Sequence, residues 1–66
     1  MPNILIIEDQ GKIRKLLVGV FKGEKYKTCD GTDWKKAVEF LNKNVYDLII
    51  VDLEVVAGGF RDAEDD

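Results

Sequence analysis

The chain has 66 residues, enough for one small domain with a limited core. With 45% hydrophobic and 35% charged residues, the composition is that of a folded protein rather than a disordered one. A net charge of −3, one cysteine and no histidine make nucleic acid an unexpected partner and exclude an internal disulfide or a structural zinc site.

The first part of the chain predicts a strand followed by a helix. Residues 3–7 form a continuous run rich in Ile and Leu, which is typical of a strand covered on both faces. The next segment has apolar residues at the i, i+3, i+4, i+7 and i+8 positions of a helix that ends near Gly23. These positions are Ile13, Leu16, Leu17, Val20 and Phe21.

The following residues repeat the same alternation. A short strand is predicted over residues 26–29, and Asp30 and Gly31 then form a turn. A second helix is expected from about Asp33 to Asn42, with Thr32 or Asp33 as its N-cap. Residues 47–51 form a second continuous run rich in Ile, Leu and Val, which predicts a third strand.

This order of elements predicts an α/β fold with a parallel sheet. Because crossover connections are right-handed, strand order 2-1-3 places one helix on each face of the three-stranded sheet. A ligand crevice is expected where the strand order reverses, at the carboxyl ends of the first and third strands. Glu8, Asp9 and Asp52 stand at those ends.

Three neighbouring carboxylates repel one another unless a cation or shared protons neutralise them. Mg²⁺ suits such a site because it takes carboxylate oxygens and leaves positions open for phosphate oxygens. With a phosphoryl group held there, a carboxylate can attack phosphorus and form an aspartyl phosphate. Asp52, alone at the end of the third strand, is the best placed nucleophile.

Five segments in this order resemble the receiver domains of two-component response regulators. They are ILIIEDQ, the IRKLL helix, the Asp30-Gly31 turn, the AVEFL helix and DLIIVDL. The resemblance implies half of a flavodoxin-like fold, with Asp52 as phosphoacceptor. It also implies a Mg²⁺ site made by Glu8, Asp9, Asp52 and the backbone carbonyl of Glu54, and a histidine kinase or small phosphodonor as partner.

The sequence departs from the receiver pattern after Asp52. Receivers follow the acceptor with Met-Pro, whereas Val56 stands where that proline is expected. The segment between Gly31 and Ala37 is also longer than usual and contains Trp34. We expect residues 1–57 to be the receiver-like half-domain and residues 58–66 to be an acidic tail or the start of a third helix. The strands carrying the family's hydroxyl residue and lysine are not found, so a truncated, switch-deficient module is expected.

Such a half-domain leaves its third strand as an open edge, and a homo-oligomer is expected to cover it. Two functions therefore stay open: a phosphoacceptor module of a phosphorelay, or a non-catalytic self-assembling module without phosphotransfer. Enzymatic activity of its own is not expected. The charged side of the first helix, which includes Lys12, Arg14 and Lys15, is interpreted as solvated surface. No membrane span or signal peptide is present, so the cytoplasm is the expected compartment.

Overall fold

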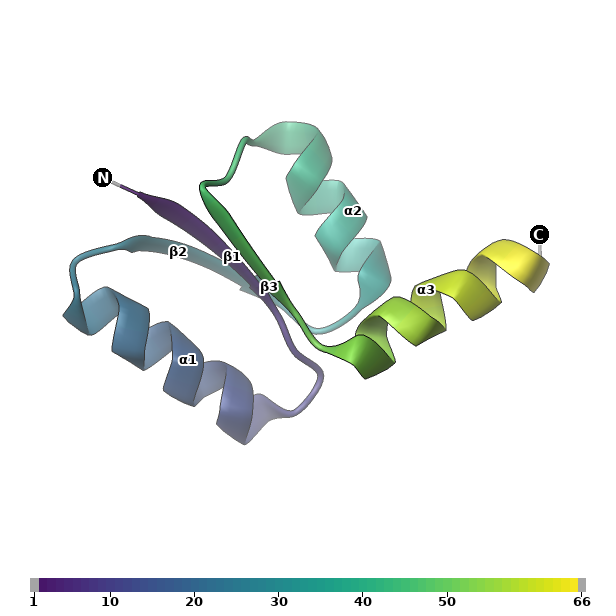
Figure 1. Ribbon diagram of the computed structural model, residues 1–66, viewed down its shortest axis with the longest axis horizontal. Helices are drawn as coiled ribbons and strands as arrows, with labels where there is room; N and C mark the ends of the chain where they lie inside the picture. Colours follow the sequence, from purple (N-terminus) through teal and green to yellow (C-terminus); the bar gives the residue numbers. More distant parts are fainter. Residues whose placement is uncertain (1, 66) are drawn as a thin grey trace.

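The chain folds as alternating strands and helices (Figure 1). The computed structural model describes the backbone of residues 2–65 and the side chains of residues 2–60. No helix among these residues is both long and apolar enough to cross a membrane. The elements are β1 (Asn3–Ile7), α1 (Gly11–Gly23), β2 (Lys27–Gly31), α2 (Trp34–Lys43), β3 (Leu48–Val51) and α3 (Leu53–Asp65).

The three strands form one parallel sheet in the order β2-β1-β3, which confirms the predicted topology. β1 is central because nearly all of its side chains are apolar and can be covered from both faces. Ile4 of β1 is in register with Thr28 of β2 and Leu48 of β3, and Ile7 with Gly31 and Val51. The carboxyl ends of all three strands therefore meet at one edge of the sheet.

Alternation along β1 divides the core between the two faces of the sheet. Leu5 and Ile7 are fully buried and pack with Ala37 of α2 and Val55 of α3. Ile4 and Ile6 point to the opposite face, since successive side chains of a strand alternate. Figure 1 shows α1 and α2 on opposite sides of the sheet, so the prediction that these two helices cover opposite faces is confirmed. The α2 side also receives α3 through Val55.

The apolar stripe of α1 is only partly covered. Leu17 and Phe21 are half-buried, whereas Ile13, Leu16 and Val20 are exposed. The main contacts of α1 are with β1 and β2, so the β3 side of this face has no covering helix among the described residues. Periodicity predicted the helix correctly, but the structure buries only part of its apolar face.

Helix α3 begins directly after Asp52 rather than at residue 58. The carbonyl of Asp52 accepts hydrogen bonds from the backbone N–H groups of Val55 (3.1 Å) and Val56 (3.2 Å). Its side-chain Oδ1 also lies 3.5 Å from the Glu54 N–H, as in an N-cap. Because Val55 reaches the core, this first turn is fixed by packing. The division of the chain at residue 57 stays a prediction.

Trp34, at the start of α2, packs against Gly59 of α3. A Cβ atom added at Gly59 would lie 2.6 Å from Cγ and Cδ2 of the Trp34 ring, which is closer than real contacts allow. Gly59 itself is buried. Glycine is therefore required at this position by the close approach of the two helices, even though it weakens a helix interior.

We predict that Gly59→Ala lowers the free energy of unfolding. Alanine gains about 0.5–1 kcal/mol in helix propensity, but overpacking against the indole costs about 1–3 kcal/mol. Urea unfolding followed by circular dichroism measures the net effect. The fluorescence of Trp34, the only tryptophan, should change because its ring must move.

Gly19→Ala is the matched control, because a Cβ there meets nothing within 4 Å. It should stabilise the protein by about 0.5–1 kcal/mol. Equal stabilisation by both substitutions would contradict the proposed Trp34 contact.

Candidate functional site

Three carboxylates meet at the carboxyl edge of the sheet. Glu8 and Asp9 follow β1, and Asp52 follows β3. Because Ile7 and Val51 are in register in neighbouring parallel strands, the residues after them emerge side by side. One oxygen from each carboxylate lies within 4.8 Å of the others. The structure thus brings together three of the four residues that the sequence assigns to a metal site.

Glu8 is the least solvated member of this cluster, with 6% of its surface exposed. Burial raises the pKa of the Glu8 carboxyl above its usual value, and the nearby Asp52 and then Asp9 carboxylates raise it further. Asp52 is half-buried and Asp9 is exposed. The site therefore resists carrying three negative charges without a compensating cation or proton.

No ion pair within the described part of the chain neutralises the cluster. The pairs present are Arg14 with Asp30, Lys36 with Glu39, and Lys43 with Glu39. An all-oxygen donor set of this kind fits a hard divalent cation such as Mg²⁺ better than a soft metal. Glu8, Asp9 and Asp52 are accordingly the residues that could hold such an ion.

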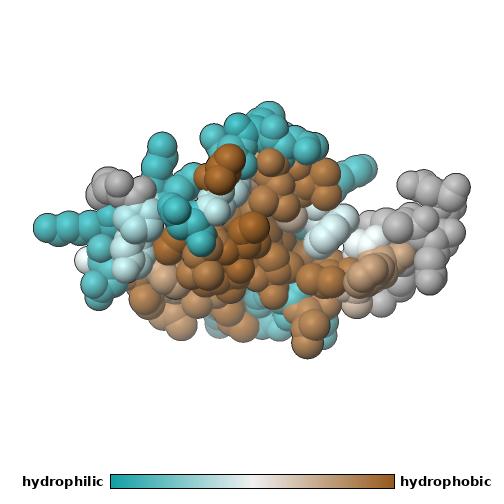
Figure 2. All heavy atoms as spheres, turned by 45° about the horizontal axis from the view of Figure 1, so that its top comes forward, coloured by the Kyte–Doolittle hydropathy of each residue, from teal (hydrophilic) through white to brown (hydrophobic). Residues whose placement is uncertain are grey.

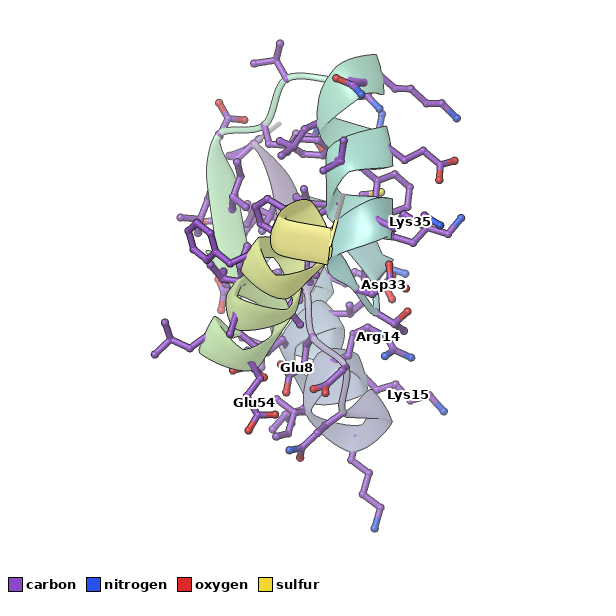
Figure 3. The ribbon with its side chains drawn as sticks, turned by 90° about the vertical axis from the view of Figure 1, so that its right-hand side faces the viewer. Glu8, Arg14, Lys15, Asp33, Lys35 and Glu54 are labelled. Atoms are coloured by element: carbon purple, nitrogen blue, oxygen red, sulfur yellow. The ribbon has the colours of Figure 1, made fainter. Side chains whose placement is uncertain are left out.

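Arg14 restrains the backbone at Glu8, although the sequence pattern placed Arg14 on the solvated side of the first helix. Its Nη1 donates to the Glu8 carbonyl at 3.0 Å, and its Nε lies 3.2 Å from Asp30 Oδ2. The Glu8 N–H donates to the Gly31 carbonyl at 3.0 Å. Figure 3 shows Arg14 and Glu8 at the end of the molecule where α1 begins. The helical pattern could not reveal this contact, because it crosses between elements.

Glu54 lies next to the cluster but in a different setting. It stands in the first turn of α3, and its side chain is exposed (Figure 3). Helical carbonyls point along the helix toward the N–H four residues on, so metal binding by the Glu54 carbonyl requires this turn to open. That role stays a prediction. A cavity of about 190 Å³ beside the site is lined in part by Asp9, Trp34 and Glu54.

Comparison with known proteins adds one finding. The family model described as the response regulator receiver domain matches residues 4–57. The match includes β1, β3 and all three carboxylates of the cluster. No curated protein and no solved structure matches the chain.

The raised pKa of Glu8 predicts how stability depends on pH. A carboxyl whose folded pKa lies above its unfolded value of 4.5 contributes stability below pH 4.5, and this contribution is lost as the pH rises through the folded pKa. Glu8→Gln cannot ionise. Its free energy of unfolding, measured in urea with a chelator present, should therefore exceed that of the unsubstituted chain increasingly from pH 4.5 to pH 7.

Glu39→Gln supplies the opposite control. Lys36 and then Lys43 lower the pKa of Glu39, so its contribution is present above pH 4.5 and is lost as the pH falls through the lowered value. The two substitutions should give pH trends of opposite sign. A Glu8→Gln difference that does not grow with pH contradicts the electrostatic account of the cluster.

Proposed function

We propose a function from one premise: the chain belongs to the response regulator receiver domain family, whose model matches most of its length. Membership supports a phosphoacceptor module of two-component signalling. In detail, we assign the acceptor role to Asp52 and the cation-binding role to Glu8 and Asp9 as well as Asp52. The observation that carries this assignment is the convergence of three carboxylate oxygens within 4.8 Å from two neighbouring strands.

Asp52 is the member of the cluster best suited to react. It is half-buried, so a phosphodonor can reach it while nearby atoms still limit access by water. Glu8 is buried, and Arg14 donates a hydrogen bond to its backbone carbonyl. Both features restrict the movement of Glu8, which suits a metal ligand. Asp9 is exposed and lines the neighbouring cavity, which suits contact with an incoming group.

The proposed reaction moves one phosphoryl group. A carboxylate oxygen of Asp52 attacks phosphorus, and the bond from phosphorus to the donor's nitrogen or oxygen breaks. The leaving atom keeps the electron pair, and Asp52 becomes an acyl phosphate. A bound Mg²⁺ would offset the charge on the carboxylates and on the phosphoryl oxygens. Glu8, Asp9 and Asp52 would hold it, with the Glu54 carbonyl as a further predicted ligand.

The phosphoryl source follows from the family. Receiver domains typically interact with histidine kinases or small phosphodonors, and we propose the same classes for this chain. We propose a reducing cytoplasm as its compartment, since Cys29 has no disulfide partner.

A second candidate is a module that assembles with copies of itself without phosphotransfer. The observation that favours it is the exposed apolar surface on α1 and β3, which includes Leu16, Val20, Leu48 and Ile49. Phosphotransfer and assembly can coexist in one chain, so each needs its own experiment.

We predict that Mg²⁺ raises the melting temperature through the carboxylate cluster. When the free Mg²⁺ concentration is ten times the dissociation constant, binding adds about 1.4 kcal/mol to the free energy of unfolding. This corresponds to a rise of roughly 6–11 °C in the melting temperature of a domain of this size. A thermal melt with and without Mg²⁺ measures the shift. Asp9→Asn should reduce it strongly, whereas Glu39→Gln, which removes a surface acid from α2, should leave it unchanged. Equal shifts in both variants would show that Mg²⁺ binds elsewhere.

We also predict that acetyl phosphate with Mg²⁺ adds one phosphoryl group to the chain. Intact mass measurement detects the product, and peptide mapping should place it on Asp52. Asp52→Asn should remain unmodified, while Glu54→Gln should still react because its side chain lies outside the cluster. If the unsubstituted chain gains no mass, the phosphoacceptor proposal fails and the assembly candidate is left.

A further inference from the structure

The side chain of Arg14 is more enclosed than those of the other bases that form ion pairs among residues 2–60. It is 19% exposed, whereas Lys36 and Lys43 are 54% and 67% exposed. Long basic side chains normally keep their charged ends in water. On the face that Figure 2 shows, hydrophilic residues lie at the top and left of the molecule, and hydrophobic residues fill its middle. The low exposure of Arg14 indicates that its contacts, rather than solvent, determine where its guanidinium lies.

Those contacts join the ends of two neighbouring strands. Arg14 Nη1 donates to the backbone carbonyl of Glu8, which follows β1, at 3.0 Å. Arg14 Nε lies 3.2 Å from Oδ2 of Asp30, which belongs to β2. A guanidinium is planar and presents its N–H groups in fixed directions. One side chain from α1 therefore links the backbone of Glu8 to the carboxylate of Asp30.

Both backbone groups of Glu8 are thereby tied to β2. Its N–H donates directly to the Gly31 carbonyl at 3.0 Å. Its carbonyl is tied to Asp30 through Arg14. Because the Glu8 side chain is also buried, its carboxylate has little freedom to move. A ligand that is restrained before a cation arrives loses less conformational freedom when the cation binds.

Arg14 also neutralises a further carboxylate near this edge of the sheet. Asp30 is in register with Ile6, one position before the last paired residues of β1 and β2. Its carboxylate is nevertheless outside the cluster of three acids. The ion pair with Arg14 accounts for this separation, because it holds the Asp30 carboxylate toward α1.

We propose that Arg14 is a positioning residue for the cation site: paired with Asp30, it holds the Glu8 backbone so that the Glu8 carboxylate is placed to bind Mg²⁺. This inference rests on the proposed function, since it requires the site of three carboxylates. Arg14 is neither a metal ligand nor a catalytic residue, because it acts only through Glu8. Groups that orient metal ligands typically change metal affinity by about 10–100-fold when they are removed.

The positive charge of Arg14 makes this role distinguishable from a simple electrostatic effect. A guanidinium near the site repels a divalent cation. If Arg14 affected the site only through its charge, its removal would strengthen Mg²⁺ binding. If Arg14 holds Glu8 in place, its removal weakens Mg²⁺ binding even though a repelling charge is lost. The direction of the change in affinity therefore separates the two effects.

Calorimetric titration of Arg14→Met with Mg²⁺ measures this direction. Methionine keeps a long unbranched side chain and a similar helix propensity, but it removes the charge and both polar contacts. The dissociation constant for Mg²⁺ should rise about tenfold. Circular dichroism at the titration temperature establishes that the variant is folded.

Lys15→Met is the matched control. It removes a positive charge from the next position of α1, where the side chain is exposed and extends away from the helix (Figure 3). Lys15 forms no ion pair within the described side chains. This variant should bind Mg²⁺ at least as tightly as the unsubstituted chain. Arg14→Lys keeps the charge but not the planar fork of donors, so its affinity should lie between those of Arg14→Met and the unsubstituted chain.

Hydrogen exchange of the metal-free chain tests the restraint itself. In the presence of a chelator, Arg14→Met should speed exchange of the Glu8 amide by a larger factor than exchange of the Ala37 amide. The Ala37 N–H donates to the Asp33 carbonyl within α2, away from Arg14. A substitution that only destabilises the whole fold would raise both exchange rates by the same factor.

The outcomes separate this inference from the proposed function. If the unsubstituted chain binds no Mg²⁺, the cation site fails and the positioning role fails with it. If it binds Mg²⁺ and Arg14→Met binds as tightly or more tightly, the positioning role is overturned while the cation site stands. Equal acceleration of Glu8 and Ala37 exchange also overturns it. Should Arg14→Met not fold, Arg14→Lys decides by the same criteria.

Discussion

The parallel pairing of β1 with β3 is the constraint on which the candidate site depends. It aligns the ends of two apolar strands, and so brings one oxygen each of Glu8 and Asp9 from one strand and of Asp52 from the other within 4.8 Å of one another. Each acid alone would be an ordinary solvated strand end. Together, with Glu8 nearly buried and its pKa raised, they form a site that favours a divalent cation. Family membership supplies the chemistry that such a site supports, which is phosphoryl transfer to a carboxylate.

Asp52 is part of both the carboxylate cluster and the N-terminus of α3. Its side chain completes the cluster, while its carbonyl and Oδ1 accept hydrogen bonds from the first backbone N–H groups of α3. The same helix packs through Val55 against the core and through Gly59 against Trp34. A change in the charge or position of the Asp52 carboxylate therefore alters the hydrogen bonding of the first turn of α3. Arg14 restrains the backbone at Glu8, because it donates a hydrogen bond to the Glu8 carbonyl and forms an ion pair with Asp30.

The carboxylate cluster and the exposed apolar surface lie on different parts of the molecule. The carboxylates follow the strand ends, whereas Leu16, Val20, Leu48 and Ile49 are exposed on α1 and β3. The proposed phosphotransfer and the proposed assembly therefore use different residues.

The sequence by itself determined the alternation of strands and helices, the strand order and the three acids of the cluster, but it predicted a turn at Asp30 and Gly31, which the structure places in β2. Periodicity marks buried strands and amphipathic helices, and the handedness of crossovers orders the strands. Only the tertiary structure decided the role of Arg14, the start of α3 at Leu53, the Trp34–Gly59 contact and the exposure of three of the five apolar residues on the α1 stripe. The physical reason is that these features depend on which surfaces of distant elements meet. Local periodicity shows that a side chain is apolar or charged, but not which neighbour covers it.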